Sequence, residues 1–181
     1  MGRYQVIRIP APRNWGTHKI EPFSEYLTRW PEVYSNVPNE VIESWIYRHW
    51  REFQQWLPLR PLEWTYELSE VTSEEVLNVG HVGDWMDTLD YWGNELFDRP
   101  MRRNTWLGRF MLENGTTPSP IIIARAAGRW SHPREHDHLM HEPLQLIEGH
   151  LRLAYLRALI RRSHATLQPS HRVVLTTLPY E

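Results

Sequence analysis

The sequence contains no cysteine. Disulfide bonds, thiolate nucleophiles and cysteine-based zinc sites are therefore excluded, and His, Asp and Glu are the strong metal ligands that remain. The sequence also lacks a run of about 20 apolar residues, which a membrane-spanning helix needs. Its first residues lack the apolar core of a secretory signal. We expect a cytoplasmic protein that does not bind membranes.

An excess of basic residues is missing too, because 20 Lys and Arg stand against 22 Asp and Glu. The net charge of -2 removes the usual electrostatic signature of a protein that coats nucleic acid, although a local basic patch is still compatible with it. Arg99, Arg102 and Arg103 form one such group beside Glu95 and Asp98. This mixture is more typical of a solvated helix start than of a nucleic-acid footprint.

Tryptophan is abundant instead: the chain has 10, most of them before residue 107. Exposed tryptophans can serve as stacking platforms for bases. We favour the other use, in which these rings fill the core between helices. The segment 38–57 supports this interpretation, because its apolar residues recur at helical spacing and Pro58 and Pro61 follow it. It predicts one continuous helix.

The rest of the first part of the chain reads as short elements. We expect strands at 4–9 and 64–68, and a helix beginning near Thr72 or Ser73. The spacing of apolar residues predicts further helices at 84–96 and from Asn104 or Thr105 to Glu113, the last ended by Asn114-Gly115. The first 103 residues therefore form a Trp-rich, mostly helical region.

After Gly115 the pattern changes to short apolar runs at 120–124, 144–148 and 172–178, which predict strands. A helix from 151 to 162 lies between the last two. Strand, glycine turn, helix and strand make a βαβ arrangement, whose crossover favours parallel pairing of the two strands. The predicted fold class is α+β, with a small mixed sheet in residues 104–181 and the helical region 1–103 packed on it, or with both parts in one continuous domain.

The segment from Glu148 to Arg152 carries the most chemistry. Gly149 permits a sharp turn after a buried strand, and the helix that begins at once directs unpaired backbone N–H groups at whatever lies beyond the strand end. Arg152 can bind phosphate oxygens with two donors, His150 can donate or accept a proton, and Glu148 can position Mg²⁺ or water. In the alternative interpretation Arg152 merely pairs with Glu148, and Gly149 is only a turn.

The order of these features resembles the ParB/sulfiredoxin-like superfamily. Its members carry a helix ending in Gly, a Pro-led apolar strand, and a strand that closes in an acidic or small residue and Gly before an Arg opens a helix. Here those features are residues 107–115, 120–124 and 147–152, followed by a strand near Val173. The resemblance covers about the last 75 residues of the chain and assigns no branch.

The resemblance implies that Gly149, His150, Leu151 and Arg152 form a nucleotide-phosphate site. Branches of the superfamily include CTP-dependent partition clamps, ATP-dependent sulfinic-acid reductases, free-serine kinases and DNA nucleases. The reductase branch needs a cysteine nucleophile and is excluded. Glu148 occupies the acidic position of the kinase-like Asp-Gly-His-His-Arg variant, and Leu151 differs from the second His expected there.

A second candidate is the histidine-rich loop between the first two of these strands, which contains His132, His136, His138, His141 and Glu142. His136, His138 and His141 could form a trigonal set for Zn²⁺ or Ni²⁺. Histidines in such a loop are more often solvated. A third interpretation makes the loop a lid, with Arg129 and Arg134 meeting the ligand.

The sequence thus predicts a ParB-like protein that binds a nucleotide or another phosphate ester, with a nucleoside triphosphate and Mg²⁺ as the expected ligands. Glu148 and His150 are its candidate catalytic residues, for a Mg²⁺-dependent nucleotide hydrolase or a DNA nuclease. The alternative is a non-catalytic plasmid- or phage-associated interaction protein, such as a regulator, antitoxin or inhibitor, on the same fold. Leu151 and the acidic charge favour this alternative, whose partner would be a protein or nucleic acid.

Overall fold

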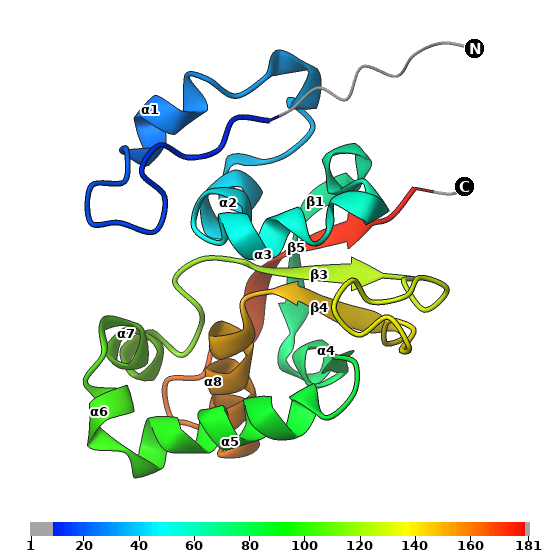
Figure 1. The fold of residues 1–181 in the computed structure, drawn as a ribbon. Helices are drawn as coiled ribbons and strands as arrows, with labels where there is room; N and C mark the ends of the chain where they lie inside the picture. Colours follow the sequence, from blue (N-terminus) through cyan, green and yellow to red (C-terminus); the bar gives the residue numbers. More distant parts are fainter. Residues whose placement is uncertain (1–8, 180–181) are drawn as a thin grey trace.

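A computed structural model describes residues 9–179, and it has an α+β fold built around a five-stranded mixed sheet (Figure 1). The strand order across the sheet is β1-β5-β3-β4-β2. The strands are β1 (Thr65–Thr72), β2 (Val79–Gly80), β3 (Ile121–Arg125), β4 (Leu144–Glu148) and β5 (Ser170–Thr177).

Short helices precede the first strand and longer ones follow it. The early helices are α1 (Phe23–Leu27), η1 (Glu32–Tyr34), α2 (Asn39–Val41), η2 (Ile42–Tyr47), α3 (Trp50–Gln54), η3 (Leu57–Leu59) and η4 (Pro61–Glu63). The later helices are α4 (Ser73–Leu77), α5 (Trp85–Asp98), α6 (Pro100–Arg103), α7 (Trp106–Asn114) and α8 (His150–Arg161).

The sheet separates two helical layers, and strand β3 shows why. Ile122 and Ala124 face a core shared with the N-terminal helices, whereas Ile121 and Ile123 face a second core shared with α5, α7 and α8. Figure 1 shows α1 to α3 on one side of the sheet and α5 to α8 on the other. Because side chains alternate along a strand, a run that is apolar at every position is needed where both faces are covered.

The predicted parallel pairing of the second and third C-terminal strands is wrong. Strand β3 lies between β4 and β5, parallel to β5 and antiparallel to β4. Four consecutive residues of β3, from Ile121 to Ala124, are fully buried. Strand β3 is apolar and buried on both faces, so it lies at the centre of the sheet. It therefore separates β4 from β5, the two strands of the expected βαβ unit.

The continuous helix predicted for 38–57 is also wrong, because the chain forms α2, a π-helix (η2), and then α3. His49, with φ -118° and ψ 43°, interrupts the helical path between η2 and α3. The interruption lets the rings of Trp45 and Phe53 meet edge to face at 5.0 Å. Packing of the large rings therefore overrides the helical periodicity.

Most other predicted elements are confirmed. Thr72 caps α4 with a reciprocal capping box to Glu75, and Thr105 caps α7 by accepting from the Gly108 N–H. The helix end at Gly115 has the expected left-handed backbone, with φ 65°. The strand predicted at 4–9 lies, except for Ile9, outside the described residues.

The two parts predicted from composition share one sheet. Strands β1 and β2 come from residues before 104 and form its two edges, and the three inner strands come from residues after 104. Trp45, Trp56 and Trp64 are buried in the N-terminal core, as expected of core-filling rings. Across residues 9–179, no helix has the length and apolar character that crossing a membrane requires.

Candidate functional site

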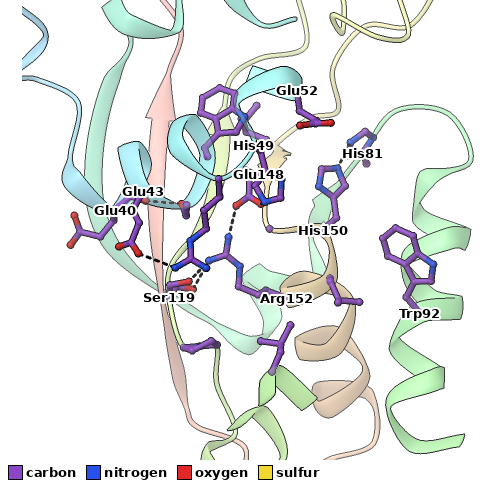
Figure 2. A pocket seen from close by; sticks show the side chains of 18 of the residues that line it. Glu40, Glu43, His49, Glu52, His81, Trp92, Ser119, Glu148, His150 and Arg152 are labelled. Atoms are coloured by element: carbon purple, nitrogen blue, oxygen red, sulfur yellow. Dashed lines mark hydrogen bonds and ion pairs between the residues drawn. The ribbon is translucent and has the colours of Figure 1, made fainter. Parts of the chain in front are cut away.

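A cavity of about 830 Å³ opens where the N-terminal layer meets the start of α8 (Figure 2). Five other regions complete its wall: the segment after β2, the first part of α5, the α6–α7 corner, the segment before β3 and the loop before β4. Its polar lining residues are Glu40, Glu43, Ser44, Arg48, His49, Glu52, His81, Arg102, Ser119, His132, Arg134, Glu148, His150 and Arg152. The segment predicted to bind phosphate therefore borders this cavity.

Gly149 makes the turn between β4 and α8. Its φ of 103° is a conformation that residues with a Cβ rarely adopt, and a Cβ there would lie 2.7 Å from Cγ2 of the buried Ile121. The helix begins at His150, so the amides of His150, Leu151 and Arg152 have no acceptor inside the helix. The predicted turn is present, and it places three backbone donors at the cavity wall.

Arg152 is 11% exposed and is held by three neighbours. Its Nη1 donates to the carbonyl oxygen of Pro120 at 3.0 Å and to Ser119, and its Nη2 donates to Glu148. The ion pair with Glu148 is the arrangement that the alternative interpretation foresaw. Among the described residues, no acceptor pairs with its Nε–H, which lies 3.3 Å from where a Cβ of Gly149 would be.

Glu148 is buried at the end of β4 and lies beside two protein groups, Arg152 and His49. One carboxylate oxygen accepts from Arg152, and the other lies 3.5 Å from His49 Nε2 (Figure 2). Both carboxylate oxygens of Glu148 already face a protein side chain. Glu148 is therefore poorly placed to bind Mg²⁺ directly. Its contact with His49 could not be predicted from the sequence pattern.

His150 does not face the cavity as a free acid or base. Its Nε2 lies 3.2 Å from Nε2 of His81, and the Val82 N–H donates to Nδ1 of His81 at 2.8 Å. Nδ1 of His81 is thus an acceptor, so its Nε2 carries the proton and donates to His150. Burial lowers the pKa of His150 to about 3, which keeps the ring neutral at physiological pH.

His132 completes a row of three histidines beside the cavity. The rings of His81 and His132 are 5.1 Å apart, as are those of His81 and His150. Burial lowers the pKa of His81 and of His132 to about 4 in each case. Arg134, held by Gln55 Oε1 at 2.6 Å, raises the electrostatic cost of protonating them. The row therefore acts as a neutral, partly aromatic wall.

Tryptophans form much of the remaining lining. Five of the 10 tryptophans in the chain border this one cavity: Trp45, Trp56, Trp85, Trp92 and Trp106. Those on α5 and α7 are not core residues in the way that composition suggested, because Trp85 and Trp92 are half-buried and Trp106 is 65% exposed. Aromatic rings beside polar side chains of fixed position are typical of a small-molecule site.

Comparisons of the chain with protein-family models, with curated proteins and with solved structures find no match. The cavity is therefore interpreted from its own geometry.

The other predicted residues are divided between the cavity and the surface. The loop between β3 and β4 brings His132 and Arg134 to the cavity wall. His136, His138 and His141 are exposed, and residues 9–179 contain no group of three or more His, Asp or Glu placed to hold a metal ion. The zinc site stays a prediction that this geometry does not support.

Sequence reasoning missed His49, His81 and Ser119. His81 stands between Gly80 and Gly83, so its position in a turn could have been noticed. His49 carried no signal, because it lay inside an apparently regular helix. Its place in the site depends on the break after η2, which a helical pattern does not indicate.

Proposed function

We propose that this chain is a ParB-like protein that binds a nucleotide in the cavity at the start of α8. The observation that carries the proposal is the meeting of two features in one cavity. The open amides of a 12-residue helix supply an anion site, and tryptophan rings supply a surface for a planar base. The order of β3, β4, the Gly149 turn, α8 and β5 is compatible with the family resemblance.

The phosphate end of the ligand would lie at the α8 N-terminus. Backbone N–H groups at a helix start favour negative charge. Gly149 allows the helix to begin directly after the strand, because it adopts a positive φ. The free Nε–H of Arg152 adds a charged donor at the same place. Arg152 therefore combines two roles, since it also fixes Glu148 and the Ser119 segment.

The base end of the ligand would lie along the tryptophans and the histidine row. The ring of Trp85 is 5.3 Å from each of the rings of His81 and His150, which continues the aromatic surface to the helix start. Neutral imidazoles suit this role, because they offer ring faces and single hydrogen-bond donors without a net charge. This surface favours a nucleotide over a simple phosphate ester.

Mg²⁺ would accompany a di- or triphosphate rather than occupy a site made by the protein alone. Metal-bound phosphates need only one or two protein carboxylates, and Glu40 and Glu43 line the cavity and would hold the ion. The ion would neutralise part of the phosphate charge. Arg48, Arg102 and Arg134 line the same cavity and would attract that charge.

A calorimetric titration of the full chain with ATP, CTP, GTP and ADP, each with and without Mg²⁺, tests this function. We expect saturable binding of at least one nucleotide and a matching rise in melting temperature. Arg152→Ala should weaken binding more than tenfold, because it removes a charged donor. Arg161→Ala, at the other end of α8, is the matched control. No binding at millimolar nucleotide would exclude the proposal.

A non-catalytic interaction protein is the second candidate, favoured by the exposed apolar side chains of Met101 and Trp106. They are 83% and 65% exposed in the α6–α7 region. Such side chains together are more typical of a contact surface than of a solvated helix face. A chain that binds no nucleotide would leave this candidate standing.

A further inference from the structure

His49 lies at the break between η2 and α3, a position that regular helix geometry does not produce. Its backbone is held from both sides: its N–H donates to Trp45 O at 2.9 Å, and its carbonyl oxygen accepts from the Phe53 N–H at 2.8 Å. π-helical segments such as η2 are frequent at functional sites. The imidazole is 49% exposed and lines the cavity (Figure 2).

The carboxylate of Glu148 is oriented toward this imidazole. Arg152 binds one of its oxygens and is itself fixed by Ser119 and by the Pro120 carbonyl, so the second oxygen is left facing His49 Nε2 at 3.5 Å. A carboxylate beside one ring nitrogen orients a neutral imidazole with its proton on that nitrogen, which leaves the other nitrogen as the proton acceptor. The pair therefore has the arrangement of a general base and the group that orients it.

The other cavity histidines do not offer this combination. His81, His132 and His150 are neutral in their buried row, and His150 already accepts a hydrogen bond from His81. Among the cavity-lining histidines, His49 has both a half-exposed ring and a carboxylate beside one ring nitrogen. It also comes from the N-terminal region, to which sequence reasoning assigned no chemical role.

We propose that His49 is the general base of a hydrolytic reaction on the phosphate of the bound nucleotide, with Glu148 as its positioning residue. This inference rests on the proposed function. Nδ1 of His49 takes a proton from water as the water oxygen bonds to the terminal phosphorus, and the bond from phosphorus to the leaving oxygen breaks. The leaving oxygen keeps the electron pair, and His49 then releases its proton to that oxygen or to solvent. The products are inorganic phosphate and the shortened nucleotide.

The test measures phosphate release and nucleotide binding side by side on the full chain. With whichever nucleotide binds, His49→Gln should slow phosphate release about 100-fold or more while Kd changes less than threefold. His18→Gln, an exposed histidine outside the cavity lining, should leave both quantities unchanged. His49→Ala should regain part of its rate when free imidazole is added, which a purely structural role of His49 would not produce.

The outcomes separate this inference from the proposed function. Wild-type protein that binds nucleotide but releases no phosphate would overturn the role of His49 and leave nucleotide binding intact. A His49→Gln variant with an unchanged rate would also overturn it. Absence of any nucleotide binding would overturn both. Melting temperatures of each variant identify a folding defect, and imidazole rescue of His49→Ala decides the question if His49→Gln is unstable.

Discussion

Glu148 and Arg152 form an ion pair across the Gly149 turn, joining the last residue of β4 to the first turn of α8. Their side chains are 12% and 11% exposed. The two residues are four positions apart in the sequence. Their side chains meet because Gly149 adopts a left-handed backbone, which lets α8 begin directly after β4. This pair fixes the carboxylate of the candidate site and connects the site to the Ser119 segment.

Arg152→Ala should destabilise the fold by about 3 kcal/mol, because it leaves the buried Glu148 carboxylate without its partner. Urea unfolding measures this loss. Arg161→Ala removes a more exposed ion pair, to Asp90, from the same helix and should cost less than about 1 kcal/mol. Equal losses in the two variants would show that the Glu148–Arg152 pair is not buried in solution.

Gly149→Ala should destabilise the protein more than Gly83→Ala. Both glycines have positive φ, at 103° and 59°, but a Cβ at Gly83 meets nothing within 4 Å. Gly83→Ala should therefore cost about 1 kcal/mol of backbone strain. Gly149→Ala should lose about 1–3 kcal/mol more, through the contact with Ile121. Comparable melting temperatures of the two variants would argue against a tight turn at 149.

Stability should fall as the pH drops from 7 toward 5, because burial lowers the pKa values of four histidines: His81, His132, His150 and His171. The pKa is about 4 for His81 and His132 and about 3 for His150. Below about pH 6.5 these imidazoles bind protons in the unfolded chain but stay neutral in the folded chain. Their contribution to stability is therefore complete above that pH and decreases as the pH falls below it. One such histidine contributes up to about 1.4 kcal/mol per pH unit.

Melting temperatures at several pH values check this slope. His132→Phe keeps a ring of similar size beside Trp56 and should flatten the pH dependence. His18→Gln changes an exposed histidine and should leave the slope as it is in the wild type. An unchanged slope in the His132 variant would mean that its ring is accessible to protons in the folded protein.

Trp85→Leu should weaken nucleotide binding about tenfold, since stacking on one aromatic ring contributes about 1–3 kcal/mol per base. The affinity for inorganic phosphate should stay the same, because the helix start is untouched. Trp30 packs against the N-terminal core away from the cavity, so Trp30→Leu provides the control for loss of a ring. Equal weakening of phosphate and nucleotide would contradict a base-binding surface at Trp85.

Local sequence signals determined much of this fold. Capping at Thr72 and Thr105, the left-handed helix end at Gly115 and the turn at Gly149 depend on the conformational preferences of single residues and their near neighbours. The apolar run at 120–124 likewise predicted a strand, which the structure places at Ile121–Arg125. These features follow from short-range physics, so the sequence alone was sufficient to predict them.

The tertiary structure decided which of these elements meet. Nothing in the local pattern places β3 between β4 and β5, or breaks the apparent helix at His49 so that its ring reaches Glu148. The segments that carry His49, His81, Ser119 and His150 are far apart in the chain and meet only when helices cover both faces of the sheet. The turn at Gly149 could be predicted from the sequence, whereas the cavity around it depends on long-range packing of tryptophan rings.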